Sequence, residues 1–515
     1  MLWLLIGLVT VVTLLYFYGT RTFDYWSKRG VKHDPPIPFF GTAKRQFLQQ
    51  ISFADIYDEM YWKYPKERFV GYYLTTTPLL ILRDPELIKR VLVSDFSYFH
   101  SRSLHPLDEV PEPMLNNLFS CEGDLWRLLR QRLTPAFTSG KLKAMFPLIV
   151  SRAEKLQLVA AEAASSSAEV DVRDLMARYT TDFIGACGFG IDTDTLSDEN
   201  SMFRKLGRRI FTQTTRDVVA TILKYMMPSM FTSLTFLDPE VSTNTISLVR
   251  TIMKQRDFKP SGRNDFIDML LELKLKGKIT GDSLEIKNPD GSPRIAEFEF
   301  DDVLMAAQVF VFFAAGFETS SSATSYTLHE LAHHPECQKK CQDEIDEVLA
   351  RYDNKLSYDA LKEMKYLNMC FSEGLRVFPS LGYLIRKCEK PYTIPDTDIT
   401  IDKGVKMIIP VKSLHADPLY WDQPEQFRPE RFHPDNVAKI HKHLYLPFGE
   451  GPRACIGERL GQMQSLAGLA AILSRFSVAP SKSTIRRPII DTKVMAVQSV
   501  LGGIPLALTA RKKIQ

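Results

Sequence analysis

The sequence predicts a mainly α-helical protein with a minor β portion, folded as one large domain behind an apolar N-terminal segment. Helical periodicity fills most of residues 85–375, and its longest uninterrupted stretch is Phe300–Leu331. Strand-like runs, rich in aromatic and branched residues, are short and lie near residue 70 and in the C-terminal part. No internal repeat or low-complexity linker divides the chain, so we expect a single body and not a string of modules.

Composition and charge exclude several classes of protein. The 515 residues are 45% hydrophobic and 24% charged, which is ordinary for a globular protein. A net charge of +4, without a concentrated basic arm, does not indicate a nucleic-acid partner. The seven cysteines are few and odd in number, which favours a reducing compartment over a disulfide framework. Cys337 and Cys341 share a helix face, but no second pair completes a zinc site.

The first element is an uncharged apolar segment, Leu2–Tyr18, which would span roughly 25 Å as a helix. A cleaved signal peptide is the competing interpretation, but no basic residue precedes the apolar run and no clear cleavage site follows it. Positive charge comes afterwards, which by the positive-inside rule leaves the rest of the chain in the cytosol. We predict a membrane anchor at residues 1–20, a basic and proline-rich hinge at 21–41, and a cytosolic domain at 42–515.

The elements that follow are predicted from local pattern. Two runs, Phe69–Leu74 and Leu79–Leu82, indicate a β-hairpin. Loops are expected at 101–120, 226–240 and 286–297, the last because of its Asn-Pro-Asp-Gly-Ser-Pro sequence. Short strands are expected around 391–410 and 493–510.

The most informative stretch for chemistry is the glycine-rich loop Phe448–Gly457, which holds one thiol, Cys455, ahead of an apolar helical pattern. Its glycines allow tight turns and the close approach of a flat ligand. The start of a helix and Arg453 both favour thiolate over thiol, and a lone thiolate suits an iron ligand that Phe448 could cover. The alternative is that Cys455 is a small buried apolar residue, as the other six cysteines are expected to be.

These positions resemble the haem-binding motif of the cytochrome P450 family, F-x-x-G-x-R-x-C-x-G, without departure. The resemblance implies the P450 fold, haem b as cofactor, and Cys455 as the axial thiolate. The segment Leu133–Lys143 is similar to vertebrate drug-metabolising P450s of the third family and to their insect relatives. Together with the stretch Asp34–Gly41, it most resembles insect xenobiotic-metabolising P450s. Pro379-Ser380 departs from the two prolines of many relatives, at the wall of the substrate pocket.

A second motif lies at the centre of the predicted helix Phe300–Leu331. Gly316 is costly there, by about 1 kcal/mol against alanine, and lets a flat group approach the backbone. The alternative is a packing glycine with Thr319 bonded back to its own helix. The resemblance to the P450 motif A-G-x-x-T instead implies that Thr319 orders water and proton delivery, fed from solvent by Glu318.

Further resemblances concern structural support and the haem propionates. Glu373 and Arg376 match the family's E-x-x-R, with Arg431 as third partner, and are assigned to folding and support of the haem loop. Four residues match positions that bind the propionates: Trp126, Arg130, Arg386 and Arg453. Each arginine alone would more often be a solvated surface residue.

The resemblance implies a monooxygenase that inserts one atom of O2 into lipophilic substrates, with plant allelochemicals and insecticides as the natural candidates. A dedicated biosynthetic hydroxylase, for a hormone or pheromone, is the alternative; an O2-independent haem-thiolate isomerase or a non-catalytic haem protein is a more distant one. By family position the pocket would draw on 101–120, 203–214, 309–319, 381–384 and 500–501.

The resemblance also implies partners and a location. Electrons would come from NADPH through the membrane NADPH–cytochrome P450 reductase, with cytochrome b5 as a possible second donor, at the endoplasmic reticulum membrane. A basic docking face for an acidic flavin domain could comprise Arg127, Arg132, Lys141 and Lys143, or these could be solvated helix residues only.

Overall fold

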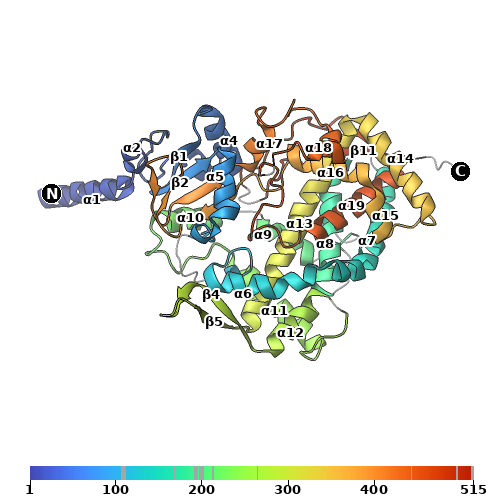
Figure 1. Cartoon of the computed structure of the whole chain (residues 1–515), viewed down its shortest axis with the longest axis horizontal. Helices are drawn as coiled ribbons and strands as arrows, with labels where there is room; N and C mark the ends of the chain where they lie inside the picture. Colours follow the sequence, from blue (N-terminus) through green and yellow to red (C-terminus); the bar gives the residue numbers. More distant parts are fainter. Residues whose placement is uncertain are drawn as a thin grey trace.

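The computed structural model describes residues 1–105, 112–166, 169–190, 195–196, 202–211, 214–263, 265–441, 443–493 and 497–511. The chain forms one mainly helical body with small sheets, as the sequence predicts (Figure 1). The α-helices are α1 (Leu2–Thr20), α2 (Tyr25–Lys28), α3 (Lys44–Phe47), α4 (Phe53–Lys63), α5 (Pro85–Lys89), α6 (Gly123–Leu133), α7 (Ser139–Ser166), α8 (Val172–Ile184), α9 (Met202–Phe211), α10 (Thr215–Met226), α11 (Pro239–Gln255), α12 (Phe266–Leu275), α13 (Asp302–His333), α14 (Pro335–Arg351), α15 (Tyr358–Glu363), α16 (Lys365–Val377), α17 (Val411–Ala416), α18 (Pro434–Val437) and α19 (Glu458–Arg475).

The strands form four small sheets in the described part of the chain. The predicted hairpin is confirmed as β1 and β2, and the largest sheet has the order β1-β2-β9-β6, with β9 parallel to β2. A second sheet has the order β10-β11-β3, and the other two are the pairs β4-β5 and β7-β8. The strands are β1 (Phe69–Leu74), β2 (Thr77–Leu82), β3 (Val170–Asp171), β4 (Lys278–Lys287), β5 (Pro293–Glu299), β6 (Leu384–Lys387), β7 (Tyr392–Thr393), β8 (Thr400–Ile401), β9 (Lys406–Ile409), β10 (Phe476–Pro480) and β11 (Pro505–Ala510).

The prediction of a plain loop at 286–297 is wrong, because most of this stretch belongs to an antiparallel hairpin. β4 pairs with β5, and the turn-rich sequence forms only the tip. The mixed polar and apolar residues of these strands hide the pattern, since most of them are exposed. Of the two predicted C-terminal strand regions, 391–410 contains β7 to β9 and 493–510 contains β11, although 494–496 lie outside the described residues. The sequence reading missed β3, β6 and β10.

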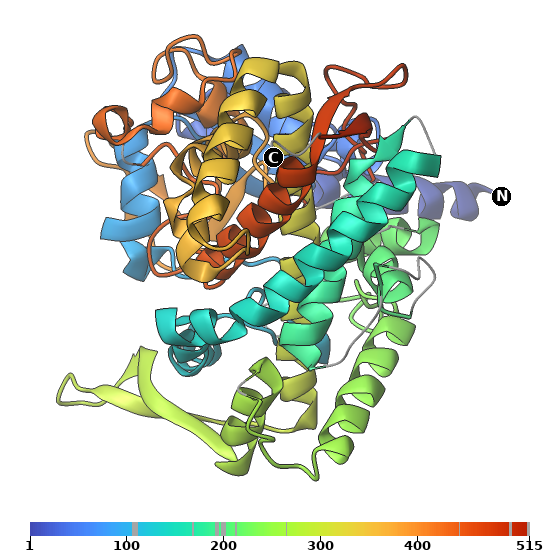
Figure 2. The same cartoon turned by 90° about the vertical axis from the view of Figure 1, so that its right-hand side faces the viewer.

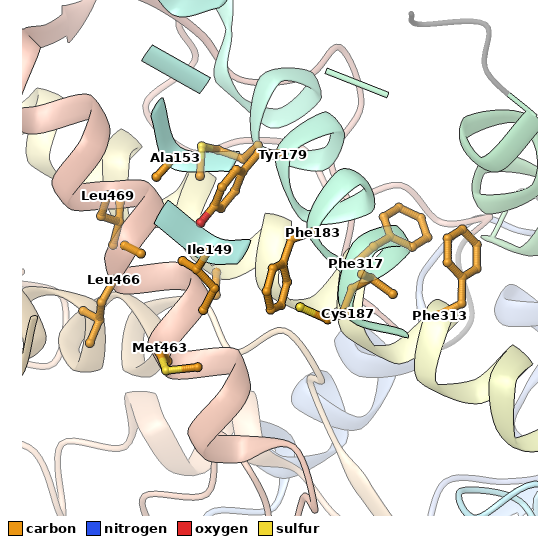
Figure 3. Close-up of a cluster of buried hydrophobic side chains, with 14 of the residues drawn as sticks. Ile149, Ala153, Tyr179, Phe183, Cys187, Phe313, Phe317, Met463, Leu466 and Leu469 are labelled. Carbon is orange, nitrogen blue, oxygen red and sulfur yellow. The ribbon is translucent and has the colours of Figure 1, made fainter. Parts of the chain in front are cut away.

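Helix α13 forms the centre of the molecule. Its first turn is capped by Asp301, whose carboxylate accepts the N–H of Leu304 at 2.7 Å. It packs against α8, α16 and α19, and most of its side chains are buried. Figure 3 shows part of the resulting core, where Phe313 and Phe317 of α13 lie in one cluster with Phe183 of α8 and Leu466 of α19. The central helix therefore carries one wall of whatever site the body encloses.

The N-terminal helix α1 is exposed over nearly its whole length, with only Gly19 buried. In the described part of the chain α1 and α13 are the two helices long and apolar enough to cross a membrane, but α13 is mostly buried inside the body. The segment 21–41, predicted as a hinge, is packed on the first sheet. Trp26 is fully buried above Gly71 and donates its indole N–H to Tyr72 O at 3.1 Å. An aromatic side chain that fits above a glycine explains why this segment is fixed.

Candidate functional site

An internal cavity of about 890 Å³ lies between the loop that contains Cys455 and the centre of α13. Cys455 and Phe448 line it on the loop side, while Ala315, Gly316 and Thr319 line it on the helix side. The two motifs that the sequence places more than a hundred residues apart therefore face the same space.

The loop Phe448–Gly457 is held by its own backbone. The N–H of Cys455 donates to Phe448 O at 2.9 Å, and the N–H of Ala454 donates to Gly451 O at 2.9 Å. Gly451 has φ +73° and its missing side chain would lie 2.0 Å from Leu92 O, so only glycine fits there. Gly457, by contrast, has φ −94°, and a side chain there would make only an ordinary contact with Phe137, at 3.9 Å, so the turn does not require glycine at that position.

The surroundings of Cys455 differ from the expectation in one respect. Its thiol has accessible surface because it borders the cavity, while protein surrounds it on its other sides. This burial raises the pKa of the Cys455 thiol, although the Gly457 N–H, Arg130 and Arg102 act to lower it. The guanidinium of Arg453, which the sequence also assigned to this effect, binds His100 O, Cys121 O and the Glu122 carboxylate. Arg130 and Arg102 therefore favour the thiolate form, against the effect of burial.

Several arginine side chains border the cavity. Arg130 reaches the cysteine loop, where it donates to Ala454 O at 2.8 Å. Arg386, on β6, is 2% exposed and its Nε has no hydrogen-bond partner among the described residues. Burial, together with nearby Arg453, lowers the pKa of Arg386 to about 9. A buried guanidinium without a carboxylate of its own is the donor that an anionic ligand group needs.

Sequence reasoning missed one further cation, Arg102. It lines the cavity and donates to Phe119 O at 2.7 Å and to Arg453 O at 3.0 Å. Burial and the neighbouring Arg386 and Arg453 lower its pKa well below the usual value. Its position in an irregular loop carried no motif. Trp126, which was predicted, lies under the Arg453 guanidinium at 4.1 Å and also lines the cavity.

The centre of α13 shows both features that the sequence left as alternatives. Thr319 Oγ1 donates back to Ala315 O at 2.6 Å, yet the residue also borders the cavity. At Gly316 a side chain would meet Ile184 Cδ1 at 2.5 Å, so this glycine accommodates a neighbouring helix while its other side borders the cavity.

Glu318 does not line the cavity. It is 8% exposed and forms an ion pair with Arg173 of α8, which also donates to Ser321 Oγ. Glu318 is therefore held away from both bulk solvent and the cavity in this conformation. Sequence reasoning did not identify Arg173 as the partner of Glu318, because Arg173 lies on a helix without a motif.

The ion-pair triad is buried as expected. Arg376 binds the Glu373 carboxylate through two nitrogens, at 2.7 and 2.8 Å, and Arg431 Nε approaches the same carboxylate at 3.2 Å. Arg376 also donates to His415 O at 2.8 Å. Burial and Arg376 lower the pKa of His415 to about 3, and its neutral Nε2 accepts the N–H of Leu446 at 2.9 Å. The triad is thus connected to the chain just before Phe448.

The substrate side of the cavity agrees with the predicted segments in most places. Residues from 101–120 and 381–384 line it, and so do Ile210 and the middle of α13; 106–111, 212 and 213 lie outside the described residues. Val497 lines it where Val500 and Leu501 were predicted. Aromatic residues from two other places also contribute, namely Tyr57 and Tyr225, beside Tyr383 of the predicted segment 381–384. Tyr57 and Tyr383 meet edge to face with ring centroids 5.1 Å apart.

Two of the four residues of the predicted docking face do not point freely to solvent. Arg127 and Arg132 donate to Ser283 O and Thr280 O of strand β4, at 3.4 and 2.9 Å. Lys143 pairs with Asp359 at 2.9 Å. Strand β4 therefore covers part of the surface that the sequence suggested for a partner.

Comparison with known proteins agrees with this geometry. The family model described as Cytochrome P450 matches residues 32–504. Among relatives, Cytochrome P450 6B2 of Helicoverpa armigera is 39% identical over 508 residues, covering 98% of both chains. Cytochrome P450 6a2 of Drosophila melanogaster is 38% identical over 507 residues, covering 97% of this chain and 98% of the relative. The protein therefore belongs to the cytochrome P450 family of monooxygenases, which use haem with a cysteine thiolate as axial ligand.

Proposed function

We propose that the cavity holds haem b, with Cys455 as its axial ligand and its propionates among Trp126, Arg130, Arg386 and Arg453. The unpartnered guanidinium nitrogen of Arg386 supports this assignment, and Arg102 adds a fifth donor. Arg453, which already binds three protein acceptors, would act mainly by fixing the loop on α6. Phe448 would cover the sulfur and limit its contact with water.

Haem bound in this way supplies the activation of O2 and the insertion of one oxygen atom into the substrate. The protein's own part is to exclude water, orient the substrate and deliver protons. Thr319 is placed for the last task, because its hydroxyl borders the cavity and can exchange its bond to Ala315 O for one to water. For Glu318 to supply protons, its ion pair with Arg173 would have to open first.

We infer that the substrates are lipophilic and include plant allelochemicals and insecticides, so that the enzyme acts in detoxification. The observation that carries this is the cavity's substrate side, where apolar and aromatic side chains from separate segments meet. The two buried carboxylates of the described lining, Asp265 and Asp268, are both paired with Arg256. Such a wall holds apolar guests with loose orientation.

The electron donor is proposed to be NADPH–cytochrome P450 reductase, with cytochrome b5 as a second donor. The exposed helix α1 supports attachment to the endoplasmic reticulum membrane with the catalytic domain in the cytosol. Membership of the cytochrome P450 family, which implies a redox partner, supports a separate electron donor.

Two measurements test the proposed function. The reduced protein with carbon monoxide should give the red-shifted Soret band of thiolate-bound haem, and absence of that band would reject Cys455 as ligand. Turnover of a panel of plant allelochemicals, insecticides and hormone-like lipids, with reductase and NADPH, should give several oxidised products. Oxidation of a single hormone or pheromone precursor alone would replace detoxification by a biosynthetic role.

Thr319→Ala should lower the fraction of NADPH consumption that yields product, by up to about tenfold. Thr324→Ala is a matched control, because Thr324 also bonds back to its own helix, at 2.8 Å to Ser320 O, but does not line the cavity. Equal coupling in wild type and Thr319→Ala would exclude the role in proton delivery.

A further inference from the structure

The β4-β5 hairpin is an element that the proposed function leaves unexplained. It lies between α12 and α13 in the chain, and Figure 2 shows it extending away from the body, beside the cyan helix α6. Most of its residues are exposed, but Ile279 and Ser283 are buried at 1% and 6% exposure. The buried residues of β4 therefore mark where the hairpin meets the body.

The meeting surface is α6, and the contacts are polar and specific. The Asp124 carboxylate accepts the hydroxyl of Ser283 at 2.6 Å and also the backbone N–H of Leu284. In return Arg127 and Arg132 donate to carbonyl oxygens of β4.

At two glycines, the backbone of one element also approaches a side chain of the other closely. A side chain on Gly281 would lie 2.7 Å from Leu128 Cδ2, and one on Gly123 would lie 2.5 Å from Glu285 Oε1. Strand β4 is thus in direct contact with α6 from Thr280 to Glu285.

The opposite face of α6 carries the proposed haem contacts. Trp126 and Arg130 are one turn apart and line the cavity. Leu128 is two residues from both, and Asp124 is two residues from Trp126 and six from Arg130; at about 100° per residue these spacings place Asp124 and Leu128 about 120–160° around the helix from Trp126 and Arg130. A displacement of α6 at its contact with the hairpin would therefore also displace Trp126 and Arg130 at the cavity.

We propose that the β4-β5 hairpin positions α6 for haem binding, with Ser283 and Asp124 as positioning residues. Asp124 in the first turn would stabilise the helix start by charge alone, but this does not account for Ser283 or for the two arginines. The proposal rests on the proposed function, since it assumes that Trp126 and Arg130 hold the haem. It assigns a haem-related role to residues that do not touch the cofactor.

The test is the rate at which full-length holoenzyme loses haem to excess apomyoglobin. Ser283→Ala should lose haem about three to ten times faster, the range that one net hydrogen bond gives. Ser283→Thr, which keeps the hydroxyl, should restore most of the wild-type rate. Ser292→Ala is the matched control: Ser292 binds Asp290 at the hairpin tip at 2.6 Å and has no described contact with α6.

A purely structural role would instead lower the urea midpoint for unfolding of the Ser283→Ala apoprotein, and Thr would not selectively restore haem retention. Unchanged haem loss in both Ser283→Ala and Asp124→Ala would overturn the proposal. So would a change in the KM for reductase without a change in haem loss, because the hairpin would then be a docking element only.

The variant Arg130→Ala tests the proposed propionate site separately from the positioning role of the hairpin. If it increases haem loss while Ser283→Ala does not, only the positioning role fails. If Arg130→Ala itself leaves haem loss unchanged, the proposed propionate site fails. With both effects present, the double variant Arg130→Ala/Ser283→Ala should lose haem more slowly than the product of the single effects predicts, because a positioning residue acts through Arg130.

Discussion

The two walls of the cavity are built in different ways. The cysteine wall is fixed by backbone hydrogen bonds within the loop, by Arg130 on Ala454 O and, further out, by the buried group around Glu373. The substrate wall is formed by side chains from separate segments, such as Tyr57, Tyr225 and Tyr383. Chemistry that needs one geometry is supported by polar networks, whereas contact with varied guests requires only shape and apolar surface.

The largest expected effect is loss of the metal ligand. Cys455→Ala should abolish the red-shifted band of the reduced carbon monoxide complex. The one other described cysteine that lines the cavity, Cys187, is a buried thiol packed in the same apolar cluster as Phe313 and Phe317. Cys388→Ala removes a buried thiol outside the cavity and should retain the band. A retained band in Cys455→Ala would show that the two walls have been assigned wrongly.

Breaking the buried triad should come next. Glu373→Ala leaves Arg376 and Arg431 buried without their carboxylate, which costs about 3–5 kcal/mol in the free energy of unfolding. Glu363→Ala breaks an exposed pair with Arg351 and should cost far less, because exposed ion pairs contribute little to stability. Urea unfolding followed by tryptophan fluorescence measures both, and similar costs for the two variants would mean that the cysteine wall gains nothing from the triad.

The His415 contact makes the same wall sensitive to acid. Because the pKa of His415 is about 3 when folded and near 6.5 when unfolded, the unfolded chain binds more protons between these values, and stability falls as pH falls below about 6.5. From about pH 7.5 to about pH 5.5 the loss from this one group should be about 1.4 kcal/mol. His415→Gln should remove that part of the pH dependence, measured as the urea midpoint at both pH values; an identical slope would refute it.

The smallest effect is expected on the substrate wall. Tyr225→Phe removes one hydroxyl, which donates to Leu104 O at 3.3 Å, from an otherwise apolar surface. We expect KM for individual substrates to change by about threefold or less and in different directions, with haem content unchanged. A uniform loss of turnover for every substrate, measured on the same panel, would mean that this wall is as constrained as the other.

Motifs made the cysteine wall predictable from sequence, because the backbone geometry of the loop requires particular residues such as Gly451. Helix α13 was predictable from its length and its capping aspartate. The ion pair between Glu318 and Arg173 and the position of Arg102 at the cavity were not predictable from sequence. Arg173 lies on a helix and Arg102 in a loop that carry no motif, and long-range pairing leaves no local pattern. The β4-β5 hairpin was missed for a related reason, since exposed strands show no apolar alternation.

The contact between helix α1 and the body determines which side of the protein lies nearest to the surroundings of that helix. Tyr18 at the end of this helix donates to Met226 O, one residue from Tyr225 of the cavity wall, and Gly19 lies against Phe39. If the residues after α1 formed a flexible linker, the body could rotate freely relative to the helix. The contacts of Tyr18 and Gly19 restrict that rotation. Compounds dissolved in a lipid layer around α1 would therefore encounter one side of the body, next to α10, at a local concentration set by their partition between lipid and water.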